Sequence, residues 1–255
     1  MNIAIVGLGL IGGSFQKAAL RAGHAVVSLH HGDFSGAEDA ELVLLALPPD
    51  AIAPWLRLHA PALRSGAVVV DAAGVKRPIL DAVRALPPGD WLFVGGHPMA
   101  GREVSGYAAS TPDLFDGASM VLTPPDGTPP AVLDRLGDFF RSLGFARVVV
   151  TTPERHDALI AFTSQLGHVI ATAYARDPLL PQSPGYTAGS FADMTRIATQ
   201  DPELWSALYL ANRDALLPVL DGFLSRLGDF REALSRADAH AIRRLIAEGT
   251  SALHR

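Results

Sequence analysis

The sequence predicts an α/β fold: an N-terminal Rossmann-type, doubly wound, mainly parallel sheet, followed by an all-α C-terminal domain. Through about the first 150 residues, short apolar runs alternate with helical stretches, which is typical of a parallel sheet with helices on both faces. A glycine-rich loop of the form G-x-G-x-x-G follows the first apolar run. After Pro153 only helical patterns remain, so we expect a domain boundary near Thr151–Pro153.

The elements of the N-terminal part are short and bounded by Gly, Pro or Asp. The expected strands are Ile3–Val6, Ala25–Leu29, Leu42–Leu47, Ala67–Val70, Leu92–Val94, Ser119–Leu122 and Val148–Val150. The expected helices between them are Gly13–Ala22, Ile52–Leu63, Pro78–Leu86 and Pro130–Leu143. The C-terminal part predicts the helices Arg155–Ala175, Thr187–Thr199, Pro202–Leu227 and Phe230–Leu253. We therefore expect a dinucleotide-binding domain over residues 1–152 and a helical domain over residues 153–255.

Composition excludes several classes of protein. The 255 residues are 49% hydrophobic, enough for a sizeable core, and the net charge of −5 argues against a nucleic-acid-binding protein. The absence of cysteine excludes disulfides, thiolate nucleophiles and cysteine-ligated metals, and we expect no metal site. The N-terminus has no basic segment before an apolar one, and no apolar run approaches about 18 residues. We expect a soluble, cytoplasmic protein that binds no membrane.

The loop Gly7-Leu8-Gly9-Leu10-Ile11-Gly12 predicts a dinucleotide site. It lies between a strand and a helix, which is the context that the motif requires. The first glycine makes the tight turn, the second lets a pyrophosphate approach the backbone, and the third allows close packing of helix and sheet. The helix N-terminus then favours the anion. A glycine turn without a ligand is the alternative.

The end of the second strand is unusual for an NAD site. An NAD site usually has an Asp or Glu there, which binds the adenosine ribose, but this chain has His30 and His31. A carboxylate would repel a 2′-phosphate, whereas a histidine pair would not and could bind it when protonated. The pattern favours NADP over NAD, although the nearby Asp33 leaves NAD open. The segment from Gly32 to Glu41 is too short for a full crossover helix.

His97 is the candidate acid–base residue. It lies in the loop sequence GGHPMAGRE, after a late strand, and so at the edge of the sheet where ligands bind. A histidine titrates near neutral pH and can take the proton of an alcohol during hydride transfer. A structural or exposed loop histidine is the alternative.

A polar stripe on the helix that begins at Arg155 points to a second part of the site. At about 100° per residue, Asp157, Ser164 and His168 lie on one face of an otherwise apolar helix, and Gln165 lies near them. Such a stripe is either a buried network or a binding site.

Asp193 and Arg196 form a further candidate pair. They are three residues apart, which suits an intrahelical ion pair. Arginine also binds a substrate carboxylate with two parallel hydrogen bonds.

Six stretches, in this order along the chain, carry a resemblance to a known family: GLGLIGGS (Gly7–Ser14), DAAGVK (Asp71–Lys76), GGHPMAG (Gly95–Gly101), HDALIAFTSQLGH (His156–His168), DMTRIA (Asp193–Ala198) and DPELWSALYLAN (Asp201–Asn212). Together the chain resembles the prephenate/arogenate dehydrogenases of tyrosine biosynthesis. The resemblance implies a Rossmann domain, a helical dimerisation domain, a homodimer, and NAD(P)+-dependent oxidative decarboxylation of prephenate to hydroxyphenylpyruvate or of arogenate to tyrosine.

The resemblance also implies roles for individual residues. His97 matches the catalytic histidine, which binds the ring hydroxyl and accepts its proton, and Arg196 matches the arginine that anchors a substrate carboxylate. Glu103 and Asp193 match acids that orient or gate this arginine. The remaining substrate-pocket matches are Ser164, Gln165, His168 and Trp205. The cofactor-site assignments are Gly7, Gly9, Leu10, Ile11, Gly12, His30, His31, Asp71 and Gly74.

The chain departs from the family pattern at three places. Gly74 stands where the family has a serine that orients the catalytic histidine, so we expect that a backbone group, a water or the substrate holds the ring, or that the site works poorly. Gln165 replaces the middle histidine of an S-H-x-P-H pattern, and the second crossover is truncated. Prephenate is the leading substrate. The alternatives are an arogenate dehydrogenase, a dehydrogenase of a related small hydroxy acid, and a dinucleotide-binding protein that has lost catalysis.

Overall fold

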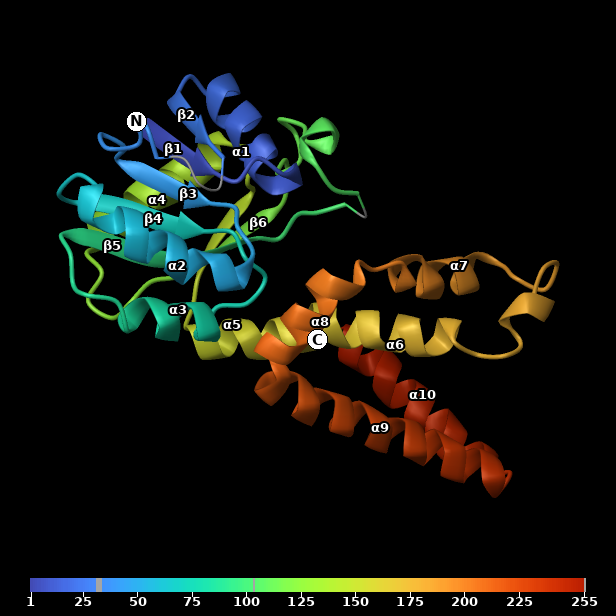
Figure 1. The fold of residues 1–255 in the computed structure, drawn as a ribbon. Helices are drawn as coiled ribbons and strands as arrows, with labels where there is room; N and C mark the ends of the chain where they lie inside the picture. Colours follow the sequence, from blue (N-terminus) through green and yellow to red (C-terminus); the bar gives the residue numbers. More distant parts are fainter. Residues whose placement is uncertain (31–33, 103, 255) are drawn as a thin grey trace.

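The computed structural model describes residues 1–30, 34–102 and 104–254. Its N-terminal half is built on one seven-stranded sheet, in the order β2-β1-β3-β4-β5-β6-β7 (Figure 1). All pairs are parallel except β5 and β6, so the expected doubly wound, mainly parallel sheet is confirmed. The strands are β1 (Asn2–Val6), β2 (Ala25–Leu29), β3 (Leu42–Leu45), β4 (Ala67–Asp71), β5 (Trp91–Pro98), β6 (Ser119–Thr123) and β7 (Arg147–Val150).

Helices cover both faces of this sheet. Side chains alternate along β1, so that Ile3 and Ile5 enter one core while Ala4 and Val6 enter the other. The first core contains Phe15 and lies under α1 (Leu10–Arg21) and α4 (Pro130–Ser142). The second lies under α2 (Pro49–His59) and α3 (Arg77–Arg84). This arrangement leaves the carboxyl ends of β1, β3, β4 and β5 at one edge of the sheet.

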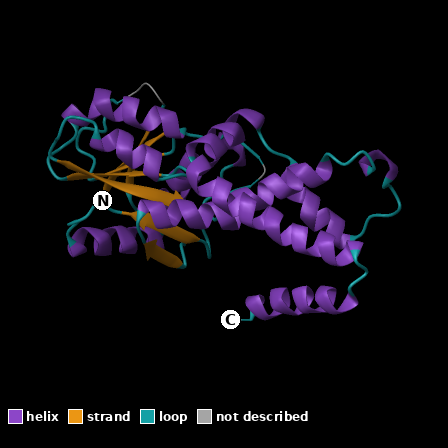
Figure 2. Ribbon diagram, turned by 90° about the horizontal axis from the view of Figure 1, so that it is seen from below, coloured by secondary structure: helices purple, strands orange, loops and turns teal. Residues whose placement is uncertain are grey.

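The C-terminal half is helical and extends away from the sheet (Figures 1 and 2). Its first helix runs without a break from α5 into α6 through one turn of π-helix. The helices are α5 (Pro153–Ile160), the π-turn Ala161–Gln165, α6 (Leu166–Ala175), α7 (Gly189–Thr195), α8 (Pro202–Ala211), α9 (Arg213–Ser235) and α10 (Ala239–Leu253). Short 3₁₀ turns lie at Ala60–Ala62, Tyr107–Ala109, Leu180–Gln182 and Arg196–Ala198.

The predicted division of the last two helices was wrong. The sequence placed a break before Phe230, but α9 continues through this region to Ser235. The structure has two breaks in this region. The first lies at Asn212, whose fully buried side chain donates hydrogen bonds to the main-chain oxygen of Asp157 at 2.9 Å and to Oε1 of Gln165 at 2.8 Å. These tertiary contacts, which no local pattern reveals, end α8 and start α9.

The turn into α10 has a local cause. Ala237 adopts a left-handed φ of 51°, and the carboxylate of Asp238 then accepts hydrogen bonds from the main-chain N–H groups of His240 and Ala241. An aspartate at this position satisfies the first N–H groups of a helix.

Within the described residues, one helix is long and apolar enough to cross a membrane by length and composition alone. It is Pro153–Ala175, with a mean hydropathy of 1.2. The sequence expectation of no such segment considered only uninterrupted apolar runs, whereas this window also averages over polar residues. Two of these, Ser164 and His168, line the pocket described next.

Candidate active site

A pocket of about 710 Å³ lies between the edge of the sheet and the helical half. Four segments supply its walls: the loop after β4, the end of β5 with the loop that follows it, the α5–α6 helix, and α8 with the segment that leads into it. The lining residues are Gly74, His97, Pro98, Met99, Ala100, Gly101, Arg102, Val104, Ser105, Ile160, Ser164, Gln165, His168, Ile197, Thr199, Gln200, Asp201, Leu204, Trp205 and Leu208. The pocket is thus built from both halves of the chain.

His97 lies at the sheet edge of this pocket, near the end of β5. Its ring is partly buried, and its two nitrogens have different surroundings. Nδ1 lies 2.9 Å from Nε2 of His156. Nε2 points toward Gly74, where a Cβ added to the glycine would lie 3.8 Å away. The Nε2 side is therefore the side that meets the pocket.

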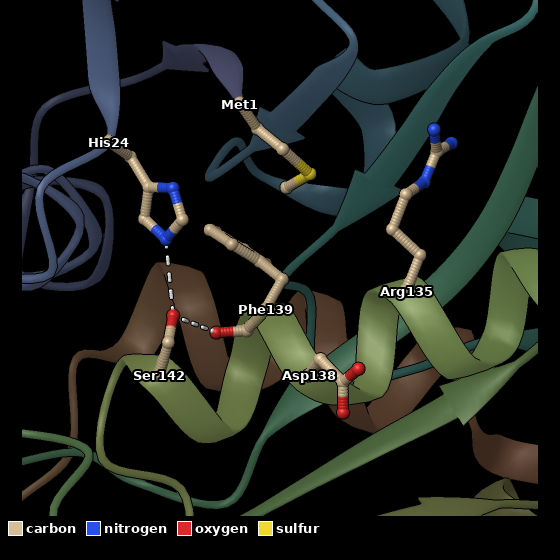
Figure 3. A pocket seen from close by; sticks show the side chains of 6 residues that line it. All are labelled: Met1, His24, Arg135, Asp138, Phe139 and Ser142. Atoms are coloured by element: carbon tan, nitrogen blue, oxygen red, sulfur yellow. Dashed lines mark hydrogen bonds between the residues drawn. The ribbon is translucent and has the colours of Figure 1, made fainter.

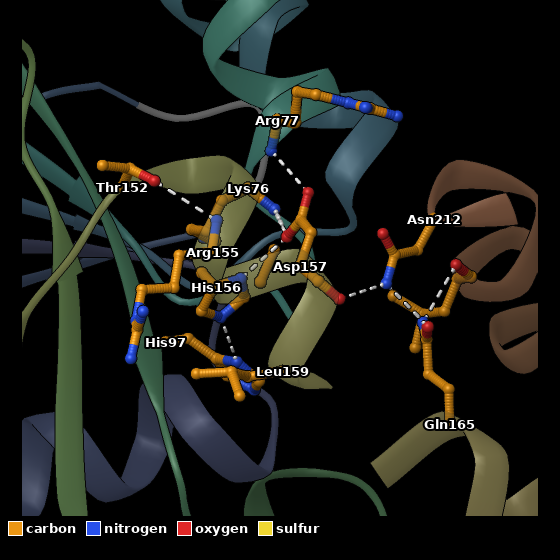
Figure 4. A network of polar contacts seen from close by, with 12 residues as sticks. Lys76, Arg77, His97, Thr152, Arg155, His156, Asp157, Leu159, Gln165 and Asn212 are labelled. Carbon is orange, nitrogen blue, oxygen red and sulfur yellow. Dashed lines mark hydrogen bonds and ion pairs between the residues drawn. The ribbon is translucent and has the colours of Figure 1, made fainter. Parts of the chain in front are cut away.

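His156 connects this ring to a carboxylate (Figure 4). Nδ1 of His156 lies 2.7 Å from Oδ1 of Asp157, and both side chains are almost fully buried. The same carboxylate accepts hydrogen bonds from the main-chain N–H groups of Lys76 at 2.8 Å and Arg77 at 2.9 Å. The start of α5 is thereby fixed to the loop that follows β4.

The expectation that a backbone group, a water or the substrate holds the His97 ring was wrong. A side chain, His156, holds it at Nδ1. The sequence missed His156 because 59 residues separate the two histidines. The only local signal was the His-Asp dipeptide at the start of a helix.

The surroundings of His97 favour its neutral form. Burial lowers the pKa of His97 well below 6.5, and the nearby His156 and Lys76 lower it further. A neutral imidazole is the form that can accept a proton. The imidazole of His97 is therefore unprotonated and available as a base at neutral pH.

Asp71 occupies a supporting position. Its side chain is fully buried and forms an ion pair with Nζ of Lys76. It also accepts hydrogen bonds from the main-chain N–H groups of Ala73 at 3.0 Å and Gly96 at 2.9 Å. The assignment of Asp71 as a direct cofactor ligand is corrected, because its carboxylate is buried among protein donors that join the ends of β4 and β5.

Lys76 completes this support beneath the site. Its side chain is fully buried, and Nζ donates a hydrogen bond to the main-chain oxygen of Gly96 at 2.6 Å, next to His97. Burial lowers the pKa of Lys76, and the carboxylate of Asp71 opposes this effect.

The predicted polar stripe on the α5–α6 helix is divided in the structure. Ser164 and His168 line the pocket, whereas Asp157 points away toward the main chain of Lys76 and Arg77. The prediction assumed a regular α-helix, but the π-turn Ala161–Gln165 changes the phase of the residues that follow it. Turns of this kind are frequent at functional sites.

Two aromatic rings form one wall of the pocket. The rings of His168 and Trp205 have centroids 3.8 Å apart, and Nδ1 of His168 donates a hydrogen bond to the main-chain oxygen of Ile197 at 3.0 Å. These contacts fix the orientation of both side chains.

Gln165 lies in the pocket wall, but its polar atoms are occupied by protein. Nε2 donates to the main-chain oxygen of Leu208 at 3.2 Å, and Oε1 accepts from Nδ2 of Asn212 at 2.8 Å. The side chain is almost fully buried. Through these two hydrogen bonds Gln165 joins the π-turn to α8 and to the start of α9.

The charged residues that line the pocket are not the ones that the sequence predicted there. Arg196 and Asp193 are exposed and are not among the described lining residues, although Ile197 is. Glu103 lies outside the described residues. Arg102 does line the pocket and was missed, although it stands in the same loop sequence as His97.

The loop after β1 fits a dinucleotide. Gly7 has a φ of +87°, and a Cβ on Gly12 would lie 1.8 Å from the main-chain oxygen of Gly7, so neither position accepts a side chain. A Cβ on Gly9 would meet nothing within 4 Å, which leaves open space at the N-terminus of α1. This is the arrangement that a pyrophosphate requires, and Leu10 and Ile11 begin the helix there.

The adenosine side of this site is only partly described. His30 is exposed just beyond the end of β2, while His31 and Asp33 lie outside the described residues. The order β2-β1-β3 places the glycine loop where the strand order reverses, which is where ligands bind in open α/β sheets.

A second hollow, of about 430 Å³, lies elsewhere in the N-terminal half (Figure 3). Nε2 of His24 lies 3.2 Å from Oγ of Ser142, whose hydroxyl donates to the main-chain oxygen of Phe139 at 2.6 Å. The other lining residues are Met1, Arg135 and Asp138. The hollow contains none of the candidate site residues.

Two family models match the chain. Residues 10–150 match the model described as prephenate dehydrogenase, nucleotide-binding domain, and residues 152–248 match prephenate dehydrogenase, dimerization domain. The two matches together span most of the chain.

Named relatives and solved structures agree with these matches. The chain is 33% identical to a cyclohexadienyl dehydrogenase of Zymomonas mobilis, over 93% of this chain and 89% of the relative. It is 28% identical to a prephenate dehydrogenase of Bacillus subtilis, over 93% of this chain and 71% of the relative. Similar structures include a Synechocystis arogenate dehydrogenase (TM-score 0.86, 28% identity, covering 100% of this chain and 99% of that one). A prephenate dehydrogenase of A. aeolicus in complex with hydroxyphenyl propionate and NAD+ gives a TM-score of 0.86 at 26% identity, covering 100% and 98%.

Proposed function

The chain belongs to the prephenate dehydrogenase family of NAD(P)-dependent oxidoreductases, and we propose that it oxidatively decarboxylates prephenate to 4-hydroxyphenylpyruvate. The observation that carries the proposal is His97, a half-buried neutral base whose Nε2 side faces the pocket at the sheet edge. The glycine loop after β1 and the ends of β4 and β5 share that edge. A substrate bound in the pocket can therefore meet both the base and a cofactor.

His97 acts on the ring hydroxyl of the substrate in this mechanism. Nε2 accepts a hydrogen bond from the hydroxyl and then its proton, as general-base catalysis requires. The bound cofactor supplies a hydride acceptor for the carbinol hydrogen. The ring carboxylate leaves as CO2, and the electron pair of the broken bond completes the aromatic ring. His97 can then return its proton to the ring oxygen.

The pocket walls orient the substrate. Arg102 lines the pocket and offers a positive charge for a substrate carboxylate, and Arg196 stands one residue before the lining residue Ile197. Ser164 and His168 supply polar groups opposite the sheet edge. Orienting the substrate in this way can account for much of the rate enhancement when the reaction itself is favourable.

Activity measurements separate the candidate functions. The purified chain is mixed with prephenate or arogenate and with NAD+ or NADP+, and reduction of the nicotinamide is followed by absorbance. Turnover of prephenate supports the proposal, and turnover of arogenate alone replaces it with the arogenate reaction. Binding of a dinucleotide without turnover of either substrate, or of small hydroxy acids, identifies a protein that has lost catalysis.

The cofactor preference is a separate proposal, for NADP over NAD. His30 lies just beyond the end of β2, where NAD sites usually have a carboxylate. His30→Asp should lower the ratio of kcat/KM for NADP to that for NAD, because the carboxylate repels the 2′-phosphate. A ratio that already favours NAD in the unmodified chain contradicts the preference.

We also propose that the helical domain, residues 153–255, forms a homodimer and that residues 1–152 form the cofactor domain. None of the residues of α10 is buried, and Figure 2 shows this helix apart from the others. Large apolar side chains are exposed on α9 and α10, including Leu224, Leu234 and Ile246. Such surfaces are typical of subunit interfaces.

The mass in solution tests the homodimer. Light scattering after gel filtration should give twice the mass of the chain. Leu234→Glu should shift the mass toward the monomer, whereas Leu58→Glu, which changes an even more exposed leucine on α2, should not. A monomeric unmodified chain contradicts the proposal.

A further inference from the structure

We propose that His156 and Asp157 are positioning residues that hold the ring of His97 and place its acceptor nitrogen, Nε2, on the pocket side. The inference rests on the proposed function, because it concerns the orientation of the base in that reaction. It depends on a continuous chain of hydrogen bonds, from two main-chain N–H groups through Asp157 and His156 to His97 (Figure 4).

The direction of the first link follows from Asp157. Its carboxylate accepts hydrogen bonds from the main-chain N–H groups of Lys76 and Arg77, so it acts as an acceptor on both oxygens. An ionised carboxylate has no proton to donate. Nδ1 of His156, 2.7 Å from Oδ1, must therefore be the donor.

The second link fixes the tautomer of His97. A neutral imidazole carries one N–H, and on His156 this N–H lies on Nδ1. Nε2 of His156 is then an acceptor, so Nδ1 of His97, 2.9 Å away, must donate. The proton of neutral His97 therefore lies on Nδ1, and the lone pair lies on Nε2, toward the pocket. In the other tautomer Nε2 could not accept a substrate proton.

No side chain at position 74 shares this task. A Cβ on Gly74 would lie 3.8 Å from Nε2 and 3.9 Å from Cε1 of His97, and 3.7 Å from Cδ2 of Leu208, so the glycine leaves an open place beside the ring. Among the described residues, the ring of His97 is hydrogen-bonded to His156, through Nδ1. The orientation of the base therefore depends on the helical half, since His156 and Asp157 belong to α5.

The test combines kinetics with a direct measurement of the tautomer. His156→Phe keeps a ring but removes the acceptor, and should lower kcat on the order of 10- to 100-fold, as when a partner that orients a functional histidine is removed. KM for the cofactor should stay the same, because the side-chain hydrogen bonds of His156 join it to His97 and Asp157 and not to the glycine loop. His24→Asn is the control, since His24 is also hydrogen-bonded but lies outside the site.

Nitrogen NMR of 15N-histidine-labelled protein reports which ring nitrogen carries the proton. The signals of His97 are assigned from their loss in His97→Asn. In the unmodified chain we expect a protonated Nδ1 and a bare Nε2, and in His156→Phe a mixture of tautomers. His156→Gln retains an acceptor oxygen, so it should keep the Nδ1 tautomer and more of kcat. This variant also tests the inference if the phenylalanine variant does not fold.

Two results overturn the inference. One is a proton on Nε2 of His97 in the unmodified chain, which would mean that His156 donates to His97. The other is a His156→Phe variant with unchanged kcat and unchanged tautomer. Absence of turnover in the unmodified chain, with the expected tautomer present, would instead refute the proposed function and leave the assigned orientation in place.

Discussion

Nδ1 of His97 and Nε2 of His156 lie 2.9 Å apart, although 59 residues separate them in the chain. The contact joins the end of β5 to the start of α5, and so it joins the two halves of the protein at the proposed catalytic base. A base held in this way depends on how the helical half docks on the sheet.

Replacing the base should abolish most of the activity. His97→Asn should lower kcat by about 10²- to 10⁴-fold, the range that a positioned general base contributes. The affinity for the dinucleotide, measured by fluorescence titration, should change little. An unchanged kcat would remove His97 from the role of base.

Activity should persist below the usual titration range of histidine. Burial lowers the pKa of His97 well below 6.5. The pH at which kcat/KM is lost on acidification should therefore lie below 6.5. A limb at or above pH 6.5 would assign the ionisation to another group.

The same shift has a consequence for stability. In the unfolded chain His97 titrates near 6.5, so below this pH the unfolded state binds a proton that the folded state does not. His97 therefore makes the fold less stable as the pH falls from 6.5 toward the lower pKa of the folded state. Denaturant titrations of the unmodified chain and of His97→Asn should differ in this direction.

A serine at position 74 should matter most when His156 is absent. From the sequence alone, Gly74→Ser should raise kcat if the missing hydroxyl limits the site. The structure changes this prediction, because His156 already holds the ring and position 74 has room for the side chain. Gly74→Ser should change kcat little by itself and should recover part of the loss in His156→Phe. We expect a coupling of about 1 kcal/mol between the two substitutions; additive effects would show that they act independently.

Two glycines of the loop after β1 should respond differently to alanine. A methyl group on Gly9 enters open space, so Gly9→Ala should weaken cofactor binding at least about tenfold while it changes the free energy of unfolding by about 1 kcal/mol or less. A methyl group on Gly12 would lie 1.8 Å from the main-chain oxygen of Gly7, and Gly12→Ala should destabilise the fold by about 1–3 kcal/mol or more. Urea denaturation and cofactor titration distinguish the two effects.

Removing the buried charge of Lys76 should destabilise the chain. Lys76→Met leaves Asp71 buried without its ion-pair partner, which typically costs about 3–5 kcal/mol. The exposed pair of Arg84 and Asp81 is the matched comparison, and Arg84→Met should cost less than about 1 kcal/mol. A similar decrease in the free energy of unfolding in both variants would show that the buried pair stabilises the fold no more than the exposed pair does.

Much of the N-terminal half could be predicted from local patterns. The strands β1, β3 and β4 are short apolar runs whose side chains alternate between two cores, as Ile3 and Ala4 do. The glycine loop could be predicted as well, because its residues are adjacent and its chemistry is that of the backbone. The helical half was harder. Asn212 ends α8 through contacts with residues about fifty positions away, and the π-turn Ala161–Gln165 has no sequence period of its own.

By itself the sequence determined the class of fold, the dinucleotide loop and the identity of His97 as the candidate base, because these depend on residues that are close together in the chain. The tertiary structure alone decided what surrounds that base. It buried Asp71 and Lys76 beneath the site and turned Asp157 away from the pocket. It also brought His156 to Nδ1 of His97. These outcomes depend on the docking of α5 against the sheet edge. The direction of a hydrogen bond across such a contact is set by the groups that meet there, and spacing in the sequence does not reveal which groups meet.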